Sequence, residues 1–407
     1  MNIELVRKLD YFLGVPLCFL GTFMKKCARI LGSGQKPGRP KNILLIELSE
    51  MGSVILADPA MLKLKQSAGA QLHFAIFRKN RASLEFFNTV PPENIFLMGD
   101  SGLLDVAMSA VRFFLWTREK QIDTVLDLEL FSRFTALLTG FSGASRTAGF
   151  YGFFNEGLYR GDFLTHKVAY NPHLHMSKNF ISLVNALMAD NGEVPYSKSL
   201  ISDGEIVLRT VEPRAEEREA VLTKIADVFP AFLPDHHRVI LFNTNSSDLI
   251  PLRRWPKENY ARLARMILNT YPDTIILLTG SPDESSDKQN LVAAIANDRC
   301  INFAGKTSIS ELVALYSVSA FMLSNDSGPA HFASVTRMPV FVFFGPETPA
   351  IYGPLGPMTP IYSGLACSPC VSAINHRKSP CKDNVCLQII SPEQVYSMIK
   401  PHCECPG

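Results

Sequence analysis

Long apolar runs and an excess of one charge are both missing from this 407-residue sequence. The uncharged stretch near its beginning, Tyr11 to Met24, spans 14 residues, whereas a helix needs about 20 to cross a bilayer. The formal net charge is only +2. These two absences argue against a membrane-spanning protein and against a dedicated nucleic-acid-binding protein.

Two well-known phosphate-binding signatures are missing as well. The sequence contains no Gly-x-x-x-x-Gly-Lys-Ser/Thr loop, and no Gly-x-Gly-x-x-Gly follows a predicted strand. Kinase, ATPase and nicotinamide chemistry therefore lose their main support. The chain is 47% hydrophobic and 19% charged, which is typical of a well-packed soluble protein, and it is long enough for two domains.

Short apolar runs alternate with segments of helical periodicity along most of the chain. In the first half, the predicted strands are 42–48, 72–77, 95–98 and 124–128, and the predicted helices are 54–66, 103–116, 131–138 and 173–189. In the second half, the predicted strands are 239–242, 274–279, 301–304, 321–323 and 340–344. Because strands that alternate with helices form parallel sheets with right-handed crossovers, we predict an α/β fold with doubly wound sheets.

The pattern predicts four parts, namely a terminal segment with a linker (1–41), two α/β domains (42–200 and 201–366) and a Cys-rich tail with a last helix (367–407). Basic residues flank the apolar stretch of the first part on both sides. We therefore expect an amphipathic segment that lies on an anionic membrane surface, followed by a flexible Gly- and Pro-rich tether. The alternative is a helix that packs on the protein's own core.

Polar residues follow successive strands of the second predicted domain. Arg253 and Arg254 follow the first strand, Glu284 the second, and a turn with Asp326 leads into a helix that contains His331. The carboxyl ends of parallel strands meet at one edge of a sheet, where arginine neutralises diphosphate, a carboxylate binds ribose hydroxyls and a helix amino end binds phosphate. Together these residues predict a nucleoside-diphosphate site. For the last turn alone, the alternative is a capped helix with a buried histidine.

Basic residues follow the strands of the first predicted domain. We expect Arg78, Lys79 and Arg133 to bind an anionic acceptor. The alternative is that these charged loops are simply solvated.

The sequence resembles glycosyltransferase family 9, the bacterial heptosyltransferases of the lipopolysaccharide core, from about Asn42 to Val395. The most specific matches are Ile43 to Pro59, Arg254-Trp255-Pro256, Gly305 to Ser308, Asn325 to His331 and Phe344-Gly345-Pro346. The resemblance implies the GT-B architecture, in which two Rossmann-like domains face each other across a cleft. It further implies that the last helix crosses back onto the first domain.

The resemblance also implies a function. This is inverting, metal-independent transfer of a sugar, heptose by default, from a nucleoside-diphosphate sugar, with ADP favoured, to an anionic lipid-linked glycan. Such an enzyme would act in peripheral contact with the cytoplasmic face of the inner membrane, with no nucleic-acid partner and no required cofactor. A catalytically silent nucleotide-sugar-binding protein and a GT-B sugar-nucleotide epimerase are the alternatives.

Matching motifs imply roles for single residues. On the donor side they are Arg253 or Arg254 at the phosphates, Glu284 at the ribose, and Asp326, Ser327, Gly328 and His331 in the donor loop. On the acceptor side, the residue after the first-turn glycine is normally Asp in this family and acts as the general base, but here it is Ser53. Serine cannot take the proton unaided. Glu50 on the same turn, or Asp58 further along the helix, could replace it, and Glu50 is the better placed.

Cysteines gather near the end of the chain. Cys367, Cys370, Cys381 and Cys386 could close a tetrahedral zinc site, although their spacing fits no standard ribbon. We interpret this cluster as structural, with zinc as the less favoured alternative.

Overall fold

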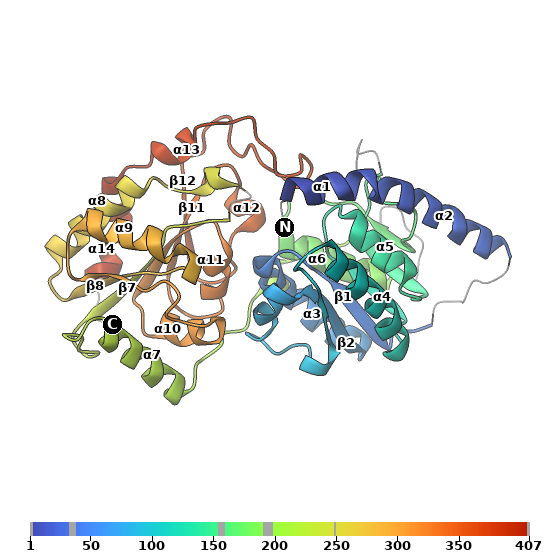
Figure 1. Cartoon of the computed structure of the whole chain (residues 1–407), viewed down its shortest axis with the longest axis horizontal. Coiled ribbons are helices and arrows are strands. Elements are labelled where there is room, and N and C mark those ends of the chain that lie inside the picture. Colours follow the sequence, from blue (N-terminus) through green and yellow to red (C-terminus); the bar gives the residue numbers. More distant parts are fainter. Residues whose placement is uncertain (1–2, 32–37, 154–158, 190–197, 248–249, 405–407) are drawn as a thin grey trace. The chain divides into compact units, whose positions relative to one another are not determined.

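The computed structural model describes residues 3–31, 38–153, 159–189, 198–247 and 250–404 (Figure 1). The chain separates into two compact units, Met1–Val207 and Leu208–Gly407. Each unit is built around one parallel six-stranded sheet with helices on both faces. The predicted fold class, α/β with two doubly wound Rossmann-like sheets, is confirmed.

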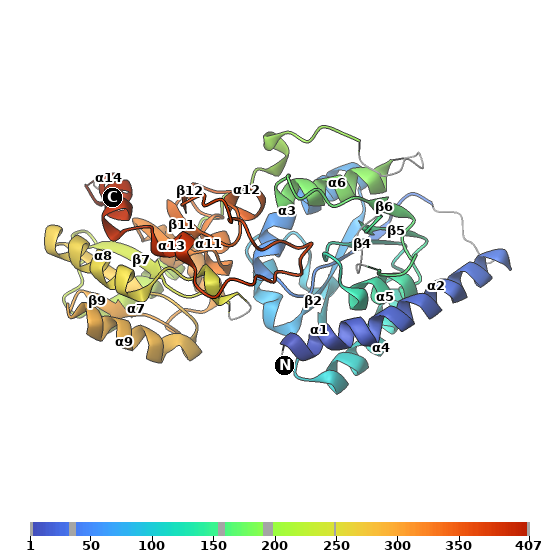
Figure 2. The same cartoon turned by 90° about the horizontal axis from the view of Figure 1, so that it is seen from above.

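The sheet of the first unit has the strand order β3-β2-β1-β4-β5-β6. Its strands are β1 (Asn42–Ile46), β2 (Gln71–Phe77), β3 (Ile95–Met98), β4 (Thr124–Asp127), β5 (Arg146–Phe150) and β6 (His166–Val168). Its helices are α1 (Ile3–Phe12), α2 (Gly14–Ile30), α3 (Met51–Ala68), α4 (Leu103–Glu119), α5 (Arg133–Phe141) and α6 (Met176–Met188). Figure 2 shows α3 and α6 on one face of this sheet and α1, α2, α4 and α5 on the other.

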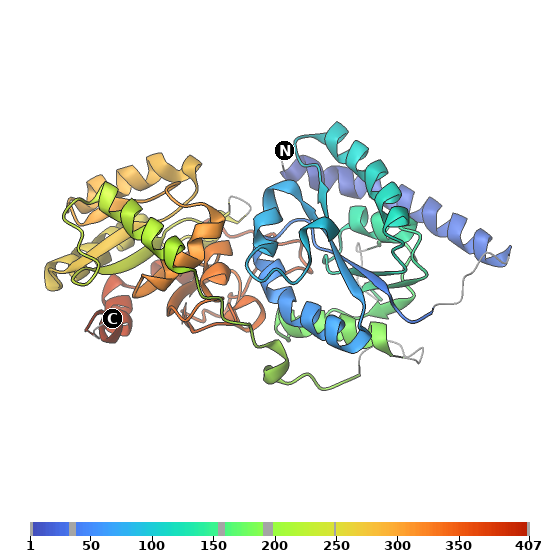
Figure 3. The same cartoon turned by 90° about the horizontal axis from the view of Figure 1, so that it is seen from below.

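The sheet of the second unit has the strand order β12-β11-β10-β7-β8-β9. Its strands are β7 (Arg238–Asn243), β8 (Thr274–Leu278), β9 (Cys300–Asn302), β10 (Phe321–Asn325), β11 (Val340–Phe344) and β12 (Met358–Tyr362). Its helices are α7 (Ala215–Val228), α8 (Lys257–Thr270), α9 (Ser285–Ile295), α10 (Leu312–Ser317), α11 (Gly328–Ala333), α12 (Pro349–Tyr352), α13 (Val385–Gln388) and α14 (Pro392–Glu404). Figure 3 shows α7, the yellow-green helix, along one face of this sheet.

The central strands are almost wholly apolar because helices cover both of their faces. In β1 the four residues Ile43 to Ile46 are completely buried, and in β11 every residue from Val340 to Phe344 is buried. Such continuous apolar runs are typical of parallel strands buried on two sides. This pattern is why these strands could be predicted. By contrast β5, β6 and β12 were not predicted, because their sequences mix polar residues with apolar ones.

The terminal segment forms the helices α1 and α2, which pack on α5. The carboxylate of Asp10 accepts hydrogen bonds from the backbone N–H groups of Arg133 and Phe134, at 3.0 and 3.1 Å, at the beginning of α5. Cys18 is fully buried, and a side chain at Gly21 would collide with the rings of Phe141 and Phe163. One side of this segment therefore packs on the first unit, as the alternative interpretation predicted, while the other side exposes apolar residues.

No helix in the described ranges is long and apolar enough to span a membrane. Most of the predicted tether, residues 32–37, lies outside the part of the chain that the structure describes. The last helix, α14, packs on α8 of the second unit, and its buried Val395 and Ile399 belong to that unit's core. The apolar face of this helix is covered within the second unit, and its expected crossing onto the first domain stays a prediction.

Candidate active site

The strand order of each sheet reverses at one position, and ligands of open α/β sheets bind beyond the strand ends at such a switch point. In the first unit the reversal lies between β1 and β4, and in the second unit it lies between β7 and β10. The polar residues that the sequence predicted as functional follow these four strands, β2 and β8. The two switch points are therefore the candidate sites, one in each unit.

At the first switch point, Glu50 is the residue that precedes α3, directly after the turn that follows β1. Its carboxylate Oε2 accepts a hydrogen bond from the hydroxyl of Ser53 at 3.1 Å. Ser53 is buried, whereas Glu50 is only partly buried. The serine that replaces the expected base is thus in contact with a carboxylate that is partly accessible to solvent.

Glu129, which follows β4, holds this turn in place. Its Oε1 accepts hydrogen bonds from the backbone N–H groups of Leu48 and Ser49, at 3.0 and 3.1 Å, and from the Ser49 hydroxyl at 2.6 Å. Burial raises the pKa of Glu129, the neighbouring charge of Asp127 adds to this rise, and these hydrogen bonds oppose it. Glu129 therefore acts as a positioning residue for the β1 turn.

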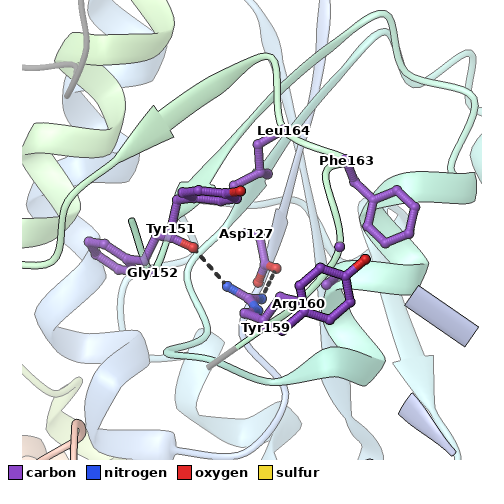
Figure 4. A pocket seen from close by; sticks show the side chains of 10 residues that line it. Asp127, Tyr151, Gly152, Tyr159, Arg160, Phe163 and Leu164 are labelled. Carbon is purple, nitrogen blue, oxygen red and sulfur yellow. Dashed lines mark hydrogen bonds and ion pairs between the residues drawn. The ribbon is translucent and has the colours of Figure 1, made fainter. Parts of the chain in front are cut away.

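Asp127 and Arg160 form a buried ion pair at 2.5 Å beside this turn (Figure 4). Arg160 also donates hydrogen bonds to the carbonyl oxygens of Ser132 and Phe150 and to the hydroxyl of Thr135. Burial raises the pKa of Asp127 and the Arg160 charge opposes the rise. This pair fixes the carboxyl ends of β4 and β5 and lies in a small pocket. The pocket is lined by Asp127, Ala136, Phe150, Tyr151, Gly152, Tyr159, Arg160, Gly161, Phe163 and Leu164.

Two of the predicted residues of the first unit are buried and in contact with protein partners. Asp58 is fully buried within α3, and its Oδ1 accepts a hydrogen bond from Thr89 at 2.5 Å. Arg133 is also buried, because its guanidinium forms an ion pair with Asp10 at 3.0 Å and lies over the ring of Tyr11. Asp58 is therefore no candidate for the general base, and Arg133 anchors the terminal helices rather than lining an acceptor site.

The other two predicted acceptor residues remain candidates. Arg78 and Lys79 are exposed directly after β2, and Arg78 lies 4.0 Å from the carboxylate of Asp105. Both side chains reach solvent on the β2 side of the first switch point. Their role toward an acceptor stays a prediction.

At the second switch point, the buried side chain of Asn325 joins three segments. Its Oδ1 accepts hydrogen bonds from the backbone N–H of Trp255 at 2.9 Å and the hydroxyl of Tyr260 at 3.1 Å, and its Nδ2 donates to the carbonyl of Thr244 at 2.8 Å. Trp255 stacks on Phe343 at 4.4 Å. These contacts hold the arginine-containing loop against the end of β10. The sequence showed Asn325 as part of a turn but not as the centre of this network.

The same loop brings Arg253 beside Asp326. The two side chains form a buried ion pair at 3.3 Å, and Arg254 donates a hydrogen bond to the carbonyl of Ser246 at 2.6 Å. Among the described residues, Nε of Arg253 and Oγ of Ser246 are buried and have no hydrogen-bond partner. Buried donors without partners are costly, so these two atoms are suited to binding a ligand that carries acceptor oxygens.

Glu347 joins this cluster, although the sequence analysis did not select it. Burial raises its pKa to about 8, the charge of Asp326 adds to this rise and the charge of Arg253 opposes it. Burial likewise raises the pKa of Asp326, opposed by Arg253. The guanidinium of Arg377 lies 3.8 Å from the carboxylate of Glu347 on another side of this cluster. Glu347 follows directly on the Phe344-Gly345-Pro346 motif, and this position was the signal that could have revealed it.

Glu284 lies at the end of a short 3₁₀ turn after β8. Its Oε2 accepts a hydrogen bond from the backbone N–H of Ser281 at 3.2 Å and lies 3.9 Å from Nζ of Lys288. A Cβ at Gly280 would meet this carboxylate, so a larger residue there would displace the Glu284 side chain. Lys288 is completely buried and donates a hydrogen bond to the hydroxyl of Thr244 at 2.8 Å. Burial lowers its pKa to about 8. The sequence analysis missed Lys288, although its position four residues after Glu284 could have indicated the contact.

The remaining donor-loop residues lie where the turn leads into α11. Ser327 precedes this helix, and its hydroxyl donates a hydrogen bond to the carbonyl of Asn325 at 3.1 Å. Gly328 begins the helix and His331 is buried within it. The structure thus brings Arg253, Arg254, Asp326 and Ser327 together, with Glu284 on the neighbouring strand end.

The cysteine cluster is not arranged as a metal centre. The described part of the chain contains no group of three or more His, Cys, Asp or Glu side chains that could hold a metal ion. Cys367, Cys370, Cys381 and Cys386 are free thiols. Burial raises the pKa of Cys386, and the three other thiols add to this rise. Zinc binding by these four cysteines stays the less favoured alternative.

Comparison with known sequences identifies relatives of one kind. The sequence model of glycosyltransferase family 9 (heptosyltransferase) matches residues 112–379. Lipooligosaccharide heptosyltransferase 2 of Haemophilus influenzae is 32% identical over 107 residues, which are 26% of this chain and 31% of that protein. The enzyme of the same name from Haemophilus ducreyi is 26% identical over 175 residues, 42% of this chain and 48% of that protein. The matches thus span about a third to a half of these relatives.

Comparison with solved structures covers more of the chain. E. coli ADP-heptose lps heptosyltransferase II superposes with a TM-score of 0.67 at 20% identity, over 89% of this chain and 98% of that one. The E. coli heptosyltransferase WaaC with ADP superposes with a TM-score of 0.61 at 16% identity, over 89% and 99% of the two chains. At these identities the likeness shows the fold.

Proposed function

The chain belongs to glycosyltransferase family 9, and we propose that it transfers a heptose from a nucleoside-diphosphate sugar to a lipid-linked glycan of the lipopolysaccharide core. The curated relatives are named as heptosyltransferases of lipooligosaccharide or lipopolysaccharide, which supports this choice of donor sugar and acceptor. The proposal divides the reaction between the two switch points. The second unit binds the donor and the first unit accepts the proton.

The observation that carries the donor half is the pair of buried, unpartnered atoms at the second switch point, Nε of Arg253 and Oγ of Ser246. Phosphate oxygens would accept hydrogen bonds from both atoms and from the neighbouring Arg254, and the two guanidinium charges would neutralise a diphosphate. In other transferases a divalent cation neutralises the diphosphate. Because the two arginines would do so here, we propose a metal-independent reaction. Glu284 would accept hydrogen bonds from the ribose hydroxyls.

We favour ADP as the nucleotide. Two of the solved structures that share this fold are described as complexes with ADP and with ADP-2-deoxy-2-fluoro heptose. Asp326, Ser327, Gly328 and His331 would surround the diphosphate-linked sugar from the turn before α11. This proposal assumes that the present chain binds the same nucleotide, ADP, as those two structures.

At the first switch point, Glu50 is the proposed general base. The acceptor hydroxyl oxygen attacks the anomeric carbon from the side opposite the diphosphate, the bond from that carbon to the diphosphate oxygen breaks, and the hydroxyl proton passes to Glu50. The configuration at the anomeric carbon is therefore inverted, and the nucleoside diphosphate leaves. Ser53, which donates a hydrogen bond to Glu50, orients the carboxylate. Arg78 and Lys79 would bind anionic groups of the acceptor.

A lipid-linked acceptor requires the enzyme to reach a membrane surface. The helices α1 and α2 expose Phe12, Phe19 and Phe23, and the basic residues Lys8 and Lys26 are exposed on the same helices. We propose that these helices lie on the cytoplasmic face of the inner membrane, with their apolar side chains among the lipids and their lysines at the anionic headgroups.

The test is a transfer assay with purified protein, ADP-heptose and a detergent-dispersed core glycan that lacks its heptose. The proposal predicts release of ADP and a matching gain of one heptose in the mass of the acceptor, in the presence of a chelator. Binding of ADP with no transfer to any core acceptor would instead support the silent binding protein. Conversion of the sugar nucleotide without an acceptor would support the epimerase.

A further inference from the structure

The helix α4 carries a line of apolar side chains that the protein itself does not cover. Leu104, Met108, Val111 and Leu115 follow one another at intervals of three or four residues, and each is more than half exposed. This spacing places them along one side of a helix. Phe113, on the opposite side of α4, is completely buried. The exposed line is therefore additional to the face with which α4 packs on the sheet.

This line lies on the same face of the first sheet as the terminal helices. Figures 1 and 2 show α4, α5 and α2 together on that face, and α5 contacts both of the other helices. Aromatic contacts connect the layer, because Phe114 of α4 packs against Phe141 of α5, which packs against Phe163 beneath α2. The three helices thus form one continuous layer.

The outer side of α2 exposes a second apolar set. Its members, each more than half exposed, are Phe19, Leu20, Phe23 and Met24. We call these four side chains and the four of α4 the α2/α4 apolar surface. Exposed basic side chains border it, Lys26 on α2 and Arg112 on α4. The α2 sequence contains no acidic residue, and the nearby carboxylate of Asp10 is already paired with Arg133. The acidic residues of α4 are Asp105, which lies 4.0 Å from Arg78, and Glu119, which is exposed in the last turn.

We infer that α4 is a second membrane-binding element and that the α2/α4 apolar surface docks the first unit on an anionic lipid bilayer. Its chemistry is that of interfacial helices, with large apolar side chains on one side and lysine or arginine at the rim. Charge favours lipid over a second copy of this chain, because a symmetric dimer through this surface would bring the basic residues of the two α2 helices together, whereas anionic headgroups would neutralise them. The inference rests on the proposed membrane-linked acceptor and adds a contact that lies outside the terminal segment.

The experiment compares the full-length wild type with the quadruple variant Leu104→Gln, Met108→Gln, Val111→Gln and Leu115→Gln. A matched control carries four exposed apolar-to-glutamine changes in the second unit, at Leu233, Val385, Ile389 and Met398. Each protein is sedimented with vesicles of phosphatidylcholine containing phosphatidylglycerol and with vesicles of phosphatidylcholine alone. Circular dichroism and thermal unfolding establish that each variant is folded.

We expect the α4 variant to bind anionic vesicles about tenfold or more weakly than the wild type, while the control binds normally. Binding of the wild type should fall on neutral vesicles and at high salt. Equal binding of the α4 variant and the wild type would overturn the inference. So would a wild-type dimer, seen by light scattering, that the α4 variant abolishes without any change in vesicle binding.

Failure of this inference can be distinguished from failure of the proposed function. Transfer to a detergent-dispersed acceptor needs no vesicle, so the folded α4 variant should keep the wild-type rate in that assay. A variant that transfers normally in detergent but is lost from vesicles supports the inference. A wild type that binds vesicles yet never transfers a sugar would refute the proposed reaction and leave the membrane surface standing.

Discussion

The first sheet reverses its strand order between β1 and β4, and the second between β7 and β10, yet the loops at these two positions differ in charge. At the first, the carboxylates of Glu50, Asp127 and Glu129 lie with one arginine, Arg160. At the second, two arginines, Arg253 and Arg254, lie with the carboxyl groups of Asp326 and Glu347. The strands place polar residues at equivalent points in both units. The loops decide whether that point suits a proton acceptor or an anion-binding site, so the difference lies in the loops and not in the fold.

The two positions also differ in how they are built. At the first, a carboxylate, Glu129, fixes the turn by accepting hydrogen bonds from backbone N–H groups. At the second, a neutral amide, Asn325, connects three segments through the hydrogen bonds of its side chain. A neutral side chain such as Asn325 suits an anion-binding site, because it does not reduce the positive electrostatic potential of the arginines.

The largest expected effect comes from a change at the first site that lowers the rate of transfer without weakening the binding of ADP at the second. Changing Glu50→Gln removes the proposed base but keeps the size of the side chain, so we expect the rate of transfer to fall by about 10²–10⁴-fold. ADP affinity should be unchanged. Steady-state kinetics with ADP-heptose measure the first quantity and calorimetry the second. Ser53→Ala, which leaves the carboxylate in place, should lower the rate by much less, and a Glu50→Gln rate within a few-fold of wild type would show that Glu50 is not the base.

Changing Arg253→Met should affect the second site and the stability of its unit. The substitution leaves Asp326 buried without its partner, so we expect the free energy of unfolding to fall by about 3 kcal/mol in urea denaturation. The double variant Arg253→Met with Asp326→Asn should recover most of this loss without recovering ADP affinity. Equal stability of the single variant and the wild type would contradict the buried pair.

The buried Lys288 should make the stability of the second unit depend on pH. Burial lowers its pKa to about 8, from an ordinary value of 10.5 that applies in the unfolded chain. Between pH 8 and pH 10.5 the unfolded chain binds more protons than the folded chain, so the free energy of unfolding should rise with pH. Below pH 8 the folded protein bears the full cost of the buried charge. Relative to the Lys288→Met variant, the wild type should gain about 2–3 kcal/mol between pH 7 and pH 10. If the unfolding free energies of the wild type and the Lys288→Met variant changed in parallel with pH, the pKa of Lys288 would not be lowered.

The smallest effect concerns the proposed ribose contact. Changing Glu284→Gln should weaken ADP binding by about tenfold, because the amide replaces a charged acceptor of hydrogen bonds. The neighbouring Asp283→Asn, in the same turn, is the matched control and should bind ADP normally. Calorimetric titration with ADP measures both variants, and equal affinities would remove Glu284 from the site.

The sequence was sufficient to predict the central strands and the strand ends at which the candidate site residues lie. Runs such as Ile43 to Ile46 are apolar because two layers of helices cover them, and the polar residues that follow such runs must lie at one sheet edge. The strands β5, β6 and β12, which lie at or next to a sheet edge, lack this pattern and could not be predicted in the same way.

Contacts between side chains that lie far apart in the sequence could not be predicted from the sequence. Arg133 has the charge expected of an acceptor-binding residue, but its pairing with Asp10 depends on where α1 packs. Asp58 is spaced like a second candidate base, but α3 turns it into the interior. Lys288 and Glu347 became candidates only when burial and neighbouring charges were known, since both effects come from the folded environment.

The division of labour between the two switch points is tested most directly by titrating ADP into two folded variants, Glu50→Gln and the double variant Arg253→Met with Asp326→Asn. The account predicts wild-type affinity for Glu50→Gln and an affinity about tenfold or more weaker for the double variant, because only the latter removes a charge that binds the diphosphate. Wild-type affinity in the double variant, or loss of ADP binding in Glu50→Gln, would contradict it.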